Sequence, residues 1–237
     1  MTTSPGHKQT LGYADGVADT STDEIDIAPS SSAGRNTTKA RLISTAERLF
    51  AKKGIDAVSI RDVTNAAKAN SAAIHYHFGS KHGLVMAVLE HRVGDLRDRR
   101  EELLAEVESM DAPTPRDLAR ALVLPSAELA NDRKGGQHYV VFVTALSNHA
   151  KYTSLVSEMF EPLSVRFLRL FETISPDLPA PVRAVRYAVA TEVVNRVFSN
   201  LAALTTWLGE HADDPDLDIP GELIDFVAAA LDGPVSR

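Results

Sequence analysis

Residues 59–81 read SIRDVTNAAKANSAAIHYHFGSK, and this stretch decides the fold. Ser59 and Asp62 have the spacing of a capping box, so a short helix is expected to begin after Ser59. Asn70 is a good N-cap for a second helix over 71–78. Two short helices joined by a turn of a few residues have the spacing of a helix-turn-helix, whose second helix enters the major groove of DNA.

Helical periodicity extends to both sides of this stretch. Before it, apolar residues at helical spacing predict a helix over 38–53, with Gly54 just past its end as a C-cap. After it, Ser80 is expected to cap a long helix that continues to about Ser109. Almost no stretch of the chain alternates with period two, so the fold is expected to be all-α.

The rest of the chain predicts five further helices, separated by proline, glycine and acidic segments. Their expected ranges are 114–131, 137–149, 152–174, 182–208 and 220–231. The 182–208 helix is apolar on more than one side, so one face must meet something other than the core beneath it. That face is covered either by other helices of the same chain or by a second subunit.

Composition excludes several classes of protein. The chain has 237 residues, of which 44% are hydrophobic and 24% are charged, so it can bury a core as one domain or two small ones. No window approaches the roughly 18 consecutive apolar residues of a membrane span, and no secretory leader is evident, so we expect a cytoplasmic protein. The absence of cysteine removes disulfides, thiolate metal ligands and thiol nucleophiles.

Charge is distributed unevenly along the sequence. Residues 1–34 carry a net charge of −4 and little periodic apolar character, and we interpret them as a disordered acidic tail. Residues 35–82 hold nine basic and three acidic residues, a net charge of +6, whereas the remainder carries −9. A short basic block on an acidic chain favours polyanion binding, and the alternative is an ordinary solvated surface.

The segment 59–81, with the preceding Phe50–Gly54 (FAKKG), resembles the DNA-binding segment of the TetR family of bacterial transcriptional regulators. The resemblance is specific over residues 38–90. In the turn, the family usually has glycine where this chain has Lys68, and a bulkier aliphatic residue where it has Ala69. A left-handed backbone there costs roughly 1 kcal/mol more for lysine than for glycine.

The resemblance implies an operator-binding head over 35–82 and a helical effector-binding and dimerisation domain over 83–237. Small residues at the start of the recognition helix allow its backbone to approach base edges, and by resemblance Tyr76 and Lys81 bind phosphate. For Tyr76 and His77 the alternative is packing beneath the turn. The candidate DNA-binding residues are Arg35, Lys39, Ser59, Arg61, Asn70, Ser71, Ala72, Ala73, His75, Tyr76, His77 and Lys81.

The second domain is expected to form a homodimer through helices 182–208 and 220–231 and to bind an unknown small apolar or amphipathic effector. Arg166 lies partly on a buried stripe and needs a partner, either Glu192 or the carboxylate of an acidic ligand. The alternative for the aromatic candidates is plain core, which aromatic residues at helical spacing more often form. The candidate effector-binding residues are Tyr139, Phe142, Asn148, Phe160, Arg166, Phe167, Thr191, Asn195 and Phe198.

No cofactor or metal is expected. His75 and His77 are two apart on a helix and point away from each other, so they cannot chelate as a pair. The sequence contains no Gly-x-Ser-x-Gly, phosphate loop or dinucleotide motif. The resemblance therefore implies a homodimeric repressor released from double-stranded operator DNA by its effector. The alternatives are a helical interaction protein that no longer binds DNA and an enzyme built on a helical bundle.

Overall fold

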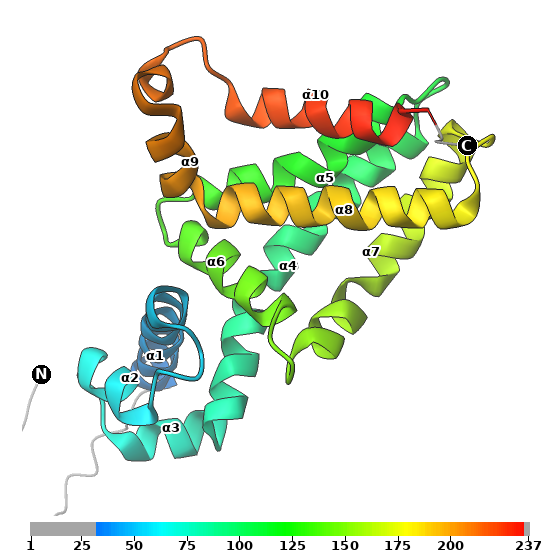
Figure 1. The fold of residues 1–237 in the computed structure, drawn as a ribbon. Coiled ribbons are helices and arrows are strands. Elements are labelled where there is room, and N and C mark those ends of the chain that lie inside the picture. Colours follow the sequence, from blue (N-terminus) through cyan, green and yellow to red (C-terminus); the bar gives the residue numbers. More distant parts are fainter. Residues whose placement is uncertain (1–31, 235–237) are drawn as a thin grey trace, which may run out of the picture.

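The structure, a computed structural model, describes residues 32–234, with side chains from Thr37 onward. Over that range the chain forms ten α-helices and one short 3-10 helix, and it has no strand (Figure 1). In chain order the elements are α1 (Ser32–Lys53), α2 (Ile60–Ala66), α3 (Ser71–Phe78), α4 (Lys81–Glu108), α5 (Pro115–Ala130), α6 (Gly136–Ser147), α7 (Thr153–Ile174), α8 (Ala180–Ser199), α9 (Leu201–Leu208), η1 (Gly209–Asp213) and α10 (Ile219–Asp232). The all-α prediction is confirmed.

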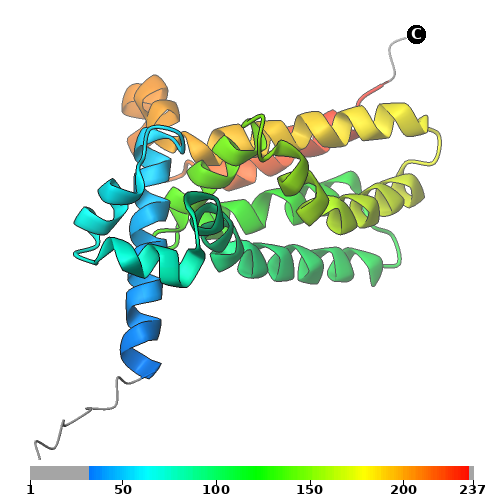
Figure 2. The ribbon, with the colours of Figure 1, turned by 90° about the horizontal axis from the view of Figure 1, so that it is seen from below.

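Helices α1, α2 and α3 form a small head, which lies at one end of the longer helices of the body (Figure 2). The Ser59 Oγ accepts a hydrogen bond from the Asp62 N–H, and an Asp62 carboxylate oxygen accepts one from the Ser59 N–H, so the predicted capping box is present. The Asn70 side chain accepts from the Ala72 N–H and caps α3. Ile74 of α3 is fully buried and anchors that helix on the head.

Helix α4 belongs to both the head and the body. The Ser80 Oγ accepts from the Gly83 N–H at its start, as expected from the sequence. Buried side chains follow one another along the helix from Leu84 to Val107. The helix contacts α1 and α3 in the head, and α5, α6 and α7 in the body, so one rigid element joins the two cores.

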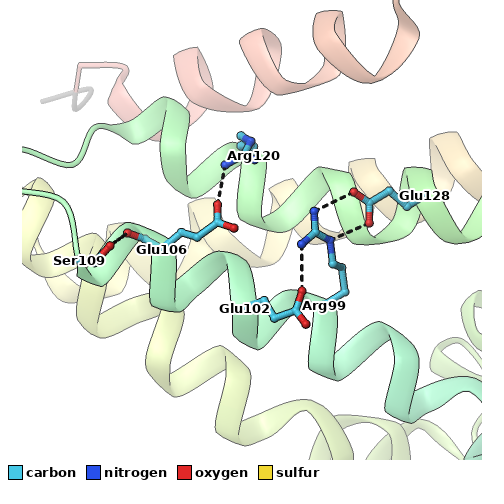
Figure 3. A network of polar contacts seen from close by, with 6 residues as sticks. All are labelled: Arg99, Glu102, Glu106, Ser109, Arg120 and Glu128. Carbon is cyan, nitrogen blue, oxygen red and sulfur yellow. Dashed lines mark hydrogen bonds and ion pairs between the residues drawn. The ribbon is translucent and has the colours of Figure 1, made fainter.

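Ion pairs fasten α4 to α5 along their exposed side (Figure 3). The Arg99 Nε lies 2.8 Å from a carboxylate oxygen of Glu128, and the Arg120 guanidinium lies 3.0 Å from Glu106. Arg99 also bonds Glu102 on its own helix, and these contacts raise the pKa of Arg99. These ion pairs join α4 to α5 at two separate points along the contact.

The body is built around α5, which lies against α10 and α8 as well as α4. Figure 1 shows α8 and α10 running alongside each other at the edge of the body farthest from α3, and the two helices are in contact. Large apolar side chains on this pair remain exposed, namely Val185, Val189 and Phe226. The predicted unpartnered apolar face is therefore present on the described chain.

The prediction of a single helix over 182–208 is wrong, because the structure has two helices there, α8 and α9. Asn200 leaves the helical conformation between them, with φ −138° and ψ 36°. Asparagine is a poor helix former because its side chain competes with the backbone for hydrogen bonds. The short α9 buries none of its residues, and its Trp207 is 83% exposed.

The first helix also differs from expectation, since α1 begins at Ser32 rather than at about Thr38. Residues 32–34 of the expected acidic tail therefore belong to α1. The remainder of that tail, residues 1–31, lies outside the described residues.

Lys68 in the turn before α3 has φ +50°, and among the described residues it is the only non-glycine residue with positive φ. The Lys68 N–H bonds the Asn65 carbonyl, which holds this turn closed. A side chain with a Cβ is strained in this conformation, whereas glycine adopts it freely. The turn keeps the helix-turn-helix geometry with lysine, but at a cost in free energy.

We expect Lys68→Gly to raise the free energy of unfolding by about 0.5 to 1 kcal/mol, because glycine removes the left-handed strain. Lys68→Ala is the matched control, since it removes the same exposed charge and keeps the Cβ. Urea denaturation followed by circular dichroism measures both variants. Equal stability of the glycine and alanine variants would contradict this account of the turn.

Candidate nucleic-acid interface

Helix α3 presents a face of small and polar residues to solvent. Ser71 and Ala72 at its start, and His75 and Tyr76 farther along, are all exposed, whereas Ala73 is half-buried. Tyr76 is 74% exposed, so it does not pack beneath the turn. The face is thus open along its length, and its first residues are small enough for the helix backbone to lie close to a partner.

His77 has a different environment from its neighbours. It is half-buried, and its ring lies 5.0 Å from the Tyr76 ring, edge to face. The exposed His75 ring bonds the Gly79 carbonyl at 3.2 Å, so it is tied to the end of its own helix. Tyr76 is therefore the large side chain of α3 that is free to reach outward.

The capping residues have hydrogen bonds within the chain. The Ser59 hydroxyl donates to the Asp62 carboxylate at 2.6 Å while it accepts from the Asp62 N–H. These bonds lower the pKa of Asp62, the Ser59 hydroxyl contributing most. Asn70 is likewise engaged with the Ala72 N–H. Ser59 and Asn70 cap the helices. A DNA contact by either side chain would use the hydrogen-bonding capacity that capping leaves free.

Cations cover the head without internal counterions. Lys39 and Arg61 are exposed, and the half-buried Lys81 donates to the Asp56 carbonyl at 3.3 Å. Arg35 lies in α1, but its side chain lies outside the described part of the chain. Over residues 37–81 as described, no Lys or Arg takes part in an ion pair.

Five further cations of the head are exposed and were not singled out from the sequence. They are Arg41, Arg48, Lys52, Lys53 and Lys68. The sequence indicated these residues only through the net positive charge of segment 35–82. A net charge does not show which side chains lie on the same face of the head. Unneutralised surface cations on one small domain are typical of a polyanion-binding surface.

Two glycines shape the corner between α3 and α4. Gly79 has φ +71° and ends α3. At Gly83 an added Cβ would lie 1.9 Å from the Phe78 carbonyl oxygen, so only glycine allows α3 to end against the first turn of α4. This close corner fixes Lys81 and the start of α4 relative to the exposed face of α3.

The body contains a cavity of about 350 Å³ between α4, α6, α7 and α8. Three of the residues expected at an effector site line it, namely Phe160, Thr191 and Asn195. Its other lining residues are Leu96, Arg100, Val143, Ser147, Thr153, Val156, Ser157, Ser164, Tyr187, Ala188 and Glu192. The cavity has both apolar and polar walls, as small-molecule sites do.

The remaining expected effector residues do not line this cavity. Four aromatic residues are buried in the core instead, namely Tyr139, Phe142, Phe167 and Phe198. The Tyr139 hydroxyl donates to the Leu89 carbonyl of α4, and burial raises the pKa of Tyr139. Asn148 is exposed, and its amide donates to the Thr144 carbonyl of its own helix.

Arg166 finds a partner that the sequence did not reveal. Its guanidinium bonds both carboxylate oxygens of Glu108, at 2.8 and 2.6 Å, and lowers the pKa of Glu108. The expectation that Arg166 pairs with Glu192 or with a ligand carboxylate is corrected accordingly, because α7 faces the end of α4 at this point. Glu192 lies in the cavity wall instead.

The turn between α6 and α7 touches both the cavity and the head. Ser147 and Thr153, on either side of it, line the cavity, and the Thr153 hydroxyl donates to the Ser147 carbonyl. Within the turn, the His149 Nε2 lies 3.1 Å from an Asp56 carboxylate oxygen of the head. Tyr152 stacks on His82 near the start of α4, with ring centroids 5.6 Å apart. A change in the cavity wall therefore has a short path to the head.

Among the described residues, no three His, Asp or Glu side chains gather closely enough to hold a metal ion. No described helix is both long and apolar enough to cross a membrane.

A helix-turn-helix head carried by a helical body defines a class of protein, and comparison with known families agrees with that class. The family model described as "Bacterial regulatory proteins, tetR family" matches residues 42–88, and "Tetracyclin repressor-like, C-terminal domain" matches residues 120–230. The chain belongs to the TetR family.

Individual relatives match mainly through the head. The HTH-type transcriptional repressor Rv3405c of Mycobacterium tuberculosis is 43% identical over 58 residues, which are 24% of this chain and 31% of that protein. The chain thus spans about a third of the length of that relative. The HTH-type transcriptional repressor BdcR of Escherichia coli is 29% identical over 162 residues, 68% of this chain and 75% of its own.

A solved structure confirms the fold over most of the described chain. The TetR family transcriptional regulator PfmR of Thermus thermophilus has a TM-score of 0.57 to this chain, with 16% identity. The match covers 83% of this chain and all of PfmR.

The Asp62 cap predicts a dependence of stability on pH. Because the folded-state pKa of Asp62 is lowered, its contribution is present above the unfolded pKa and is lost as the pH falls through the folded pKa. Asp62→Asn should therefore destabilise the protein at neutral pH and match wild type in acid, as measured by urea denaturation. Asp98→Asn, at an exposed position of α4, is the control and should show no such convergence. A constant difference between wild type and Asp62→Asn would contradict the cap.

Proposed function

We propose that this protein is a homodimeric transcriptional repressor, whose head binds double-stranded operator DNA in the cytoplasm. The observation that carries the proposal is the exposed face of α3, with Tyr76 projecting from it on a head whose cations lack internal counterions. Ser71 can donate or accept at a base edge, and the Ala72 methyl can meet a thymine methyl. Tyr76 and the exposed cations of the head serve the phosphates, which position the head.

Dimerisation is supported by the apolar face of α8 and α10. Val185 and Val189 lie one turn apart on α8 and are 62% and 56% exposed, and Phe226 on α10 is 61% exposed. Exposed apolar residues on adjacent helices are typical of a subunit interface. A twofold dimer presents its recognition helices to successive turns of the major groove, about 34–36 Å apart.

The cavity is proposed to hold the effector. A bound molecule would act on α4 and on the turn between α6 and α7, both of which reach the head. It can shift the protein away from the DNA-binding arrangement only by its difference in affinity between the two arrangements, typically about 1–3 kcal/mol.

The two alternative functions are less well supported. An interaction protein that has lost DNA binding would need no open α3 face, and Lys68 leaves the turn geometry intact. For an enzyme, the described cavity wall offers Glu192 as its one carboxylate, and Glu192 bonds none of the lining hydroxyls. Turnover of a bound ligand would revive that alternative.

DNA binding is tested by fluorescence anisotropy with labelled duplexes from upstream of the protein's own gene and its neighbours. We expect binding that weakens steeply with salt, and a loss of about tenfold in affinity for Tyr76→Ala, which removes a phosphate contact. The control Val165→Ala removes an exposed apolar side chain of α7, outside the head and outside the proposed dimer interface, and should bind as wild type. Failure of every duplex to bind, or wild-type affinity in Tyr76→Ala, would contradict the proposal.

Coupling between cavity and head is tested at His149. For a ligand found by its rise in melting temperature, His149→Ala should reduce the ligand's effect on operator affinity by up to about fivefold, because it removes the bond to Asp56. Asn148→Ala is the control, since that side chain bonds only its own helix. The coupling path is wrong if both variants respond to the ligand as wild type does.

A further inference from the structure

Arg100 is a buried cation in the wall of the cavity. It lies on α4, four residues after Leu96 and three before Leu103, on the buried stripe of that helix. The residue is 8% exposed, and it lines the cavity together with Leu96. An arginine at such a position needs compensation, because taking its charge out of water is costly.

Arg100 lacks that compensation within the described chain. Its one hydrogen bond there is a long one, from the guanidinium to the Leu122 carbonyl at 3.5 Å. Its Nε is buried with no hydrogen-bond partner, and none of the ion pairs among residues 37–234 includes it. The neighbouring Arg99, by contrast, bonds two carboxylates. Burial lowers the pKa of Arg100, although a guanidinium remains charged in proteins.

We propose that the effector is an amphipathic carboxylate, whose anionic head pairs with Arg100 and whose apolar body fills the remainder of the cavity. This inference rests on the proposed function, because it names the chemical class of the molecule that the cavity binds. A guanidinium presents a planar pair of donors that matches the two oxygens of a carboxylate. Binding would satisfy the buried Nε and neutralise the charge in one contact.

The other walls of the cavity fit such a molecule. Val143, Val156 and Phe160 offer apolar surface for a hydrocarbon or aromatic body. The Ser164 hydroxyl donates to the Phe160 carbonyl and lies 2.9 Å from the Tyr187 hydroxyl, so both hydroxyl protons are used within the chain and Arg100 is left to pair with the anion. A cavity of about 350 Å³ lies in the range of small-molecule sites.

Glu192 also lines the cavity but does not take the place of the proposed ligand. It is exposed to solvent, whereas Arg100 is buried, and no ion pair joins the two among the described side chains. Solvent screens the charge of Glu192, so its repulsion of a carboxylate held at Arg100 is weak. The buried end of the cavity therefore favours an anion even though a carboxylate lies in its wall.

The position of Arg100 also connects ligand charge to DNA binding. Arg100 belongs to α4, which continues into the head and carries Lys81 at its start. A molecule whose carboxylate bonds Arg100 and whose apolar body packs against α7 and α8 would draw these helices into one arrangement. An uncharged ligand of the same shape lacks the contact that does this.

The test compares octanoate, decanoate and naphthoate with their primary amides, using isothermal titration calorimetry on the full chain. We expect at least one carboxylate to bind wild type tenfold or more tightly than its amide, and Arg100→Met to abolish that preference. Arg97→Met removes a charge from a half-buried position on the same helix, where the arginine pairs with Glu101, and should keep the preference. Equal binding of acid and amide, no binding of any carboxylate, or a preference retained in Arg100→Met would overturn the proposal.

A measurement without ligand separates ligand recognition from a structural role. Because an unpaired buried charge is unfavourable, Arg100→Met should melt at a higher temperature than wild type when no ligand is present. A lower melting temperature would assign Arg100 to structure and overturn the inference. Operator binding by the ligand-free protein is measured separately, so a failure of the carboxylate proposal leaves that result standing, and the reverse also holds.

Discussion

Helix α4 runs without a break from the head into the body, and both cores pack on it. Its buried side chains extend from Leu84, beside the head, to Val107, deep in the body, so the head and the body are packed on one helix. A packed helix transmits displacement because its neighbours leave little space in which to absorb it. The orientation of the exposed α3 face is therefore set by how the body holds the far end of α4.

Charge is arranged around this helix in two ways. Where α4 meets its neighbours, its charges pair with side chains of the same protein chain, as in Arg99 with Glu128 and Glu108 with Arg166. In the head and in the cavity, cations are left without an internal counterion. The exposed cations of the head cost little because water solvates them, whereas Arg100 is costly because it is buried. In the proposed function, DNA phosphates pair with the cations of the head, and the carboxylate of the ligand pairs with Arg100.

The sequence predicts best what is decided locally. Ser59, Asn70 and Ser80 cap the expected helices because each cap depends on residues within three positions. The strain at Lys68 was predicted from the family resemblance, because the family usually has glycine at this position of the turn, and Lys68 does have a positive φ. The break at Asn200 was hidden because the apolar pattern continues across it.

Contacts between distant parts of the chain were beyond sequence reasoning. Arg166 and Glu108 are 58 residues apart, and His149 and Asp56 are 93 apart, so nothing local indicates either pair. Arg100 was different. Its spacing from Leu96 and Leu103 places it on the buried stripe of α4, and that signal was present in the sequence.

Whether α4 couples the cavity to the head is tested by the distance between the two heads of the proposed dimer. The chain has no cysteine, so Asn65→Cys on the exposed side of α2 accepts one spin label per subunit. Electron–electron double resonance then measures the label separation with operator duplex and with a bound carboxylate. If α4 connects cavity and head, the carboxylate changes this distance in the labelled protein and leaves it unchanged when Arg100→Met is added. An identical distance distribution with operator and with bound carboxylate would contradict the account.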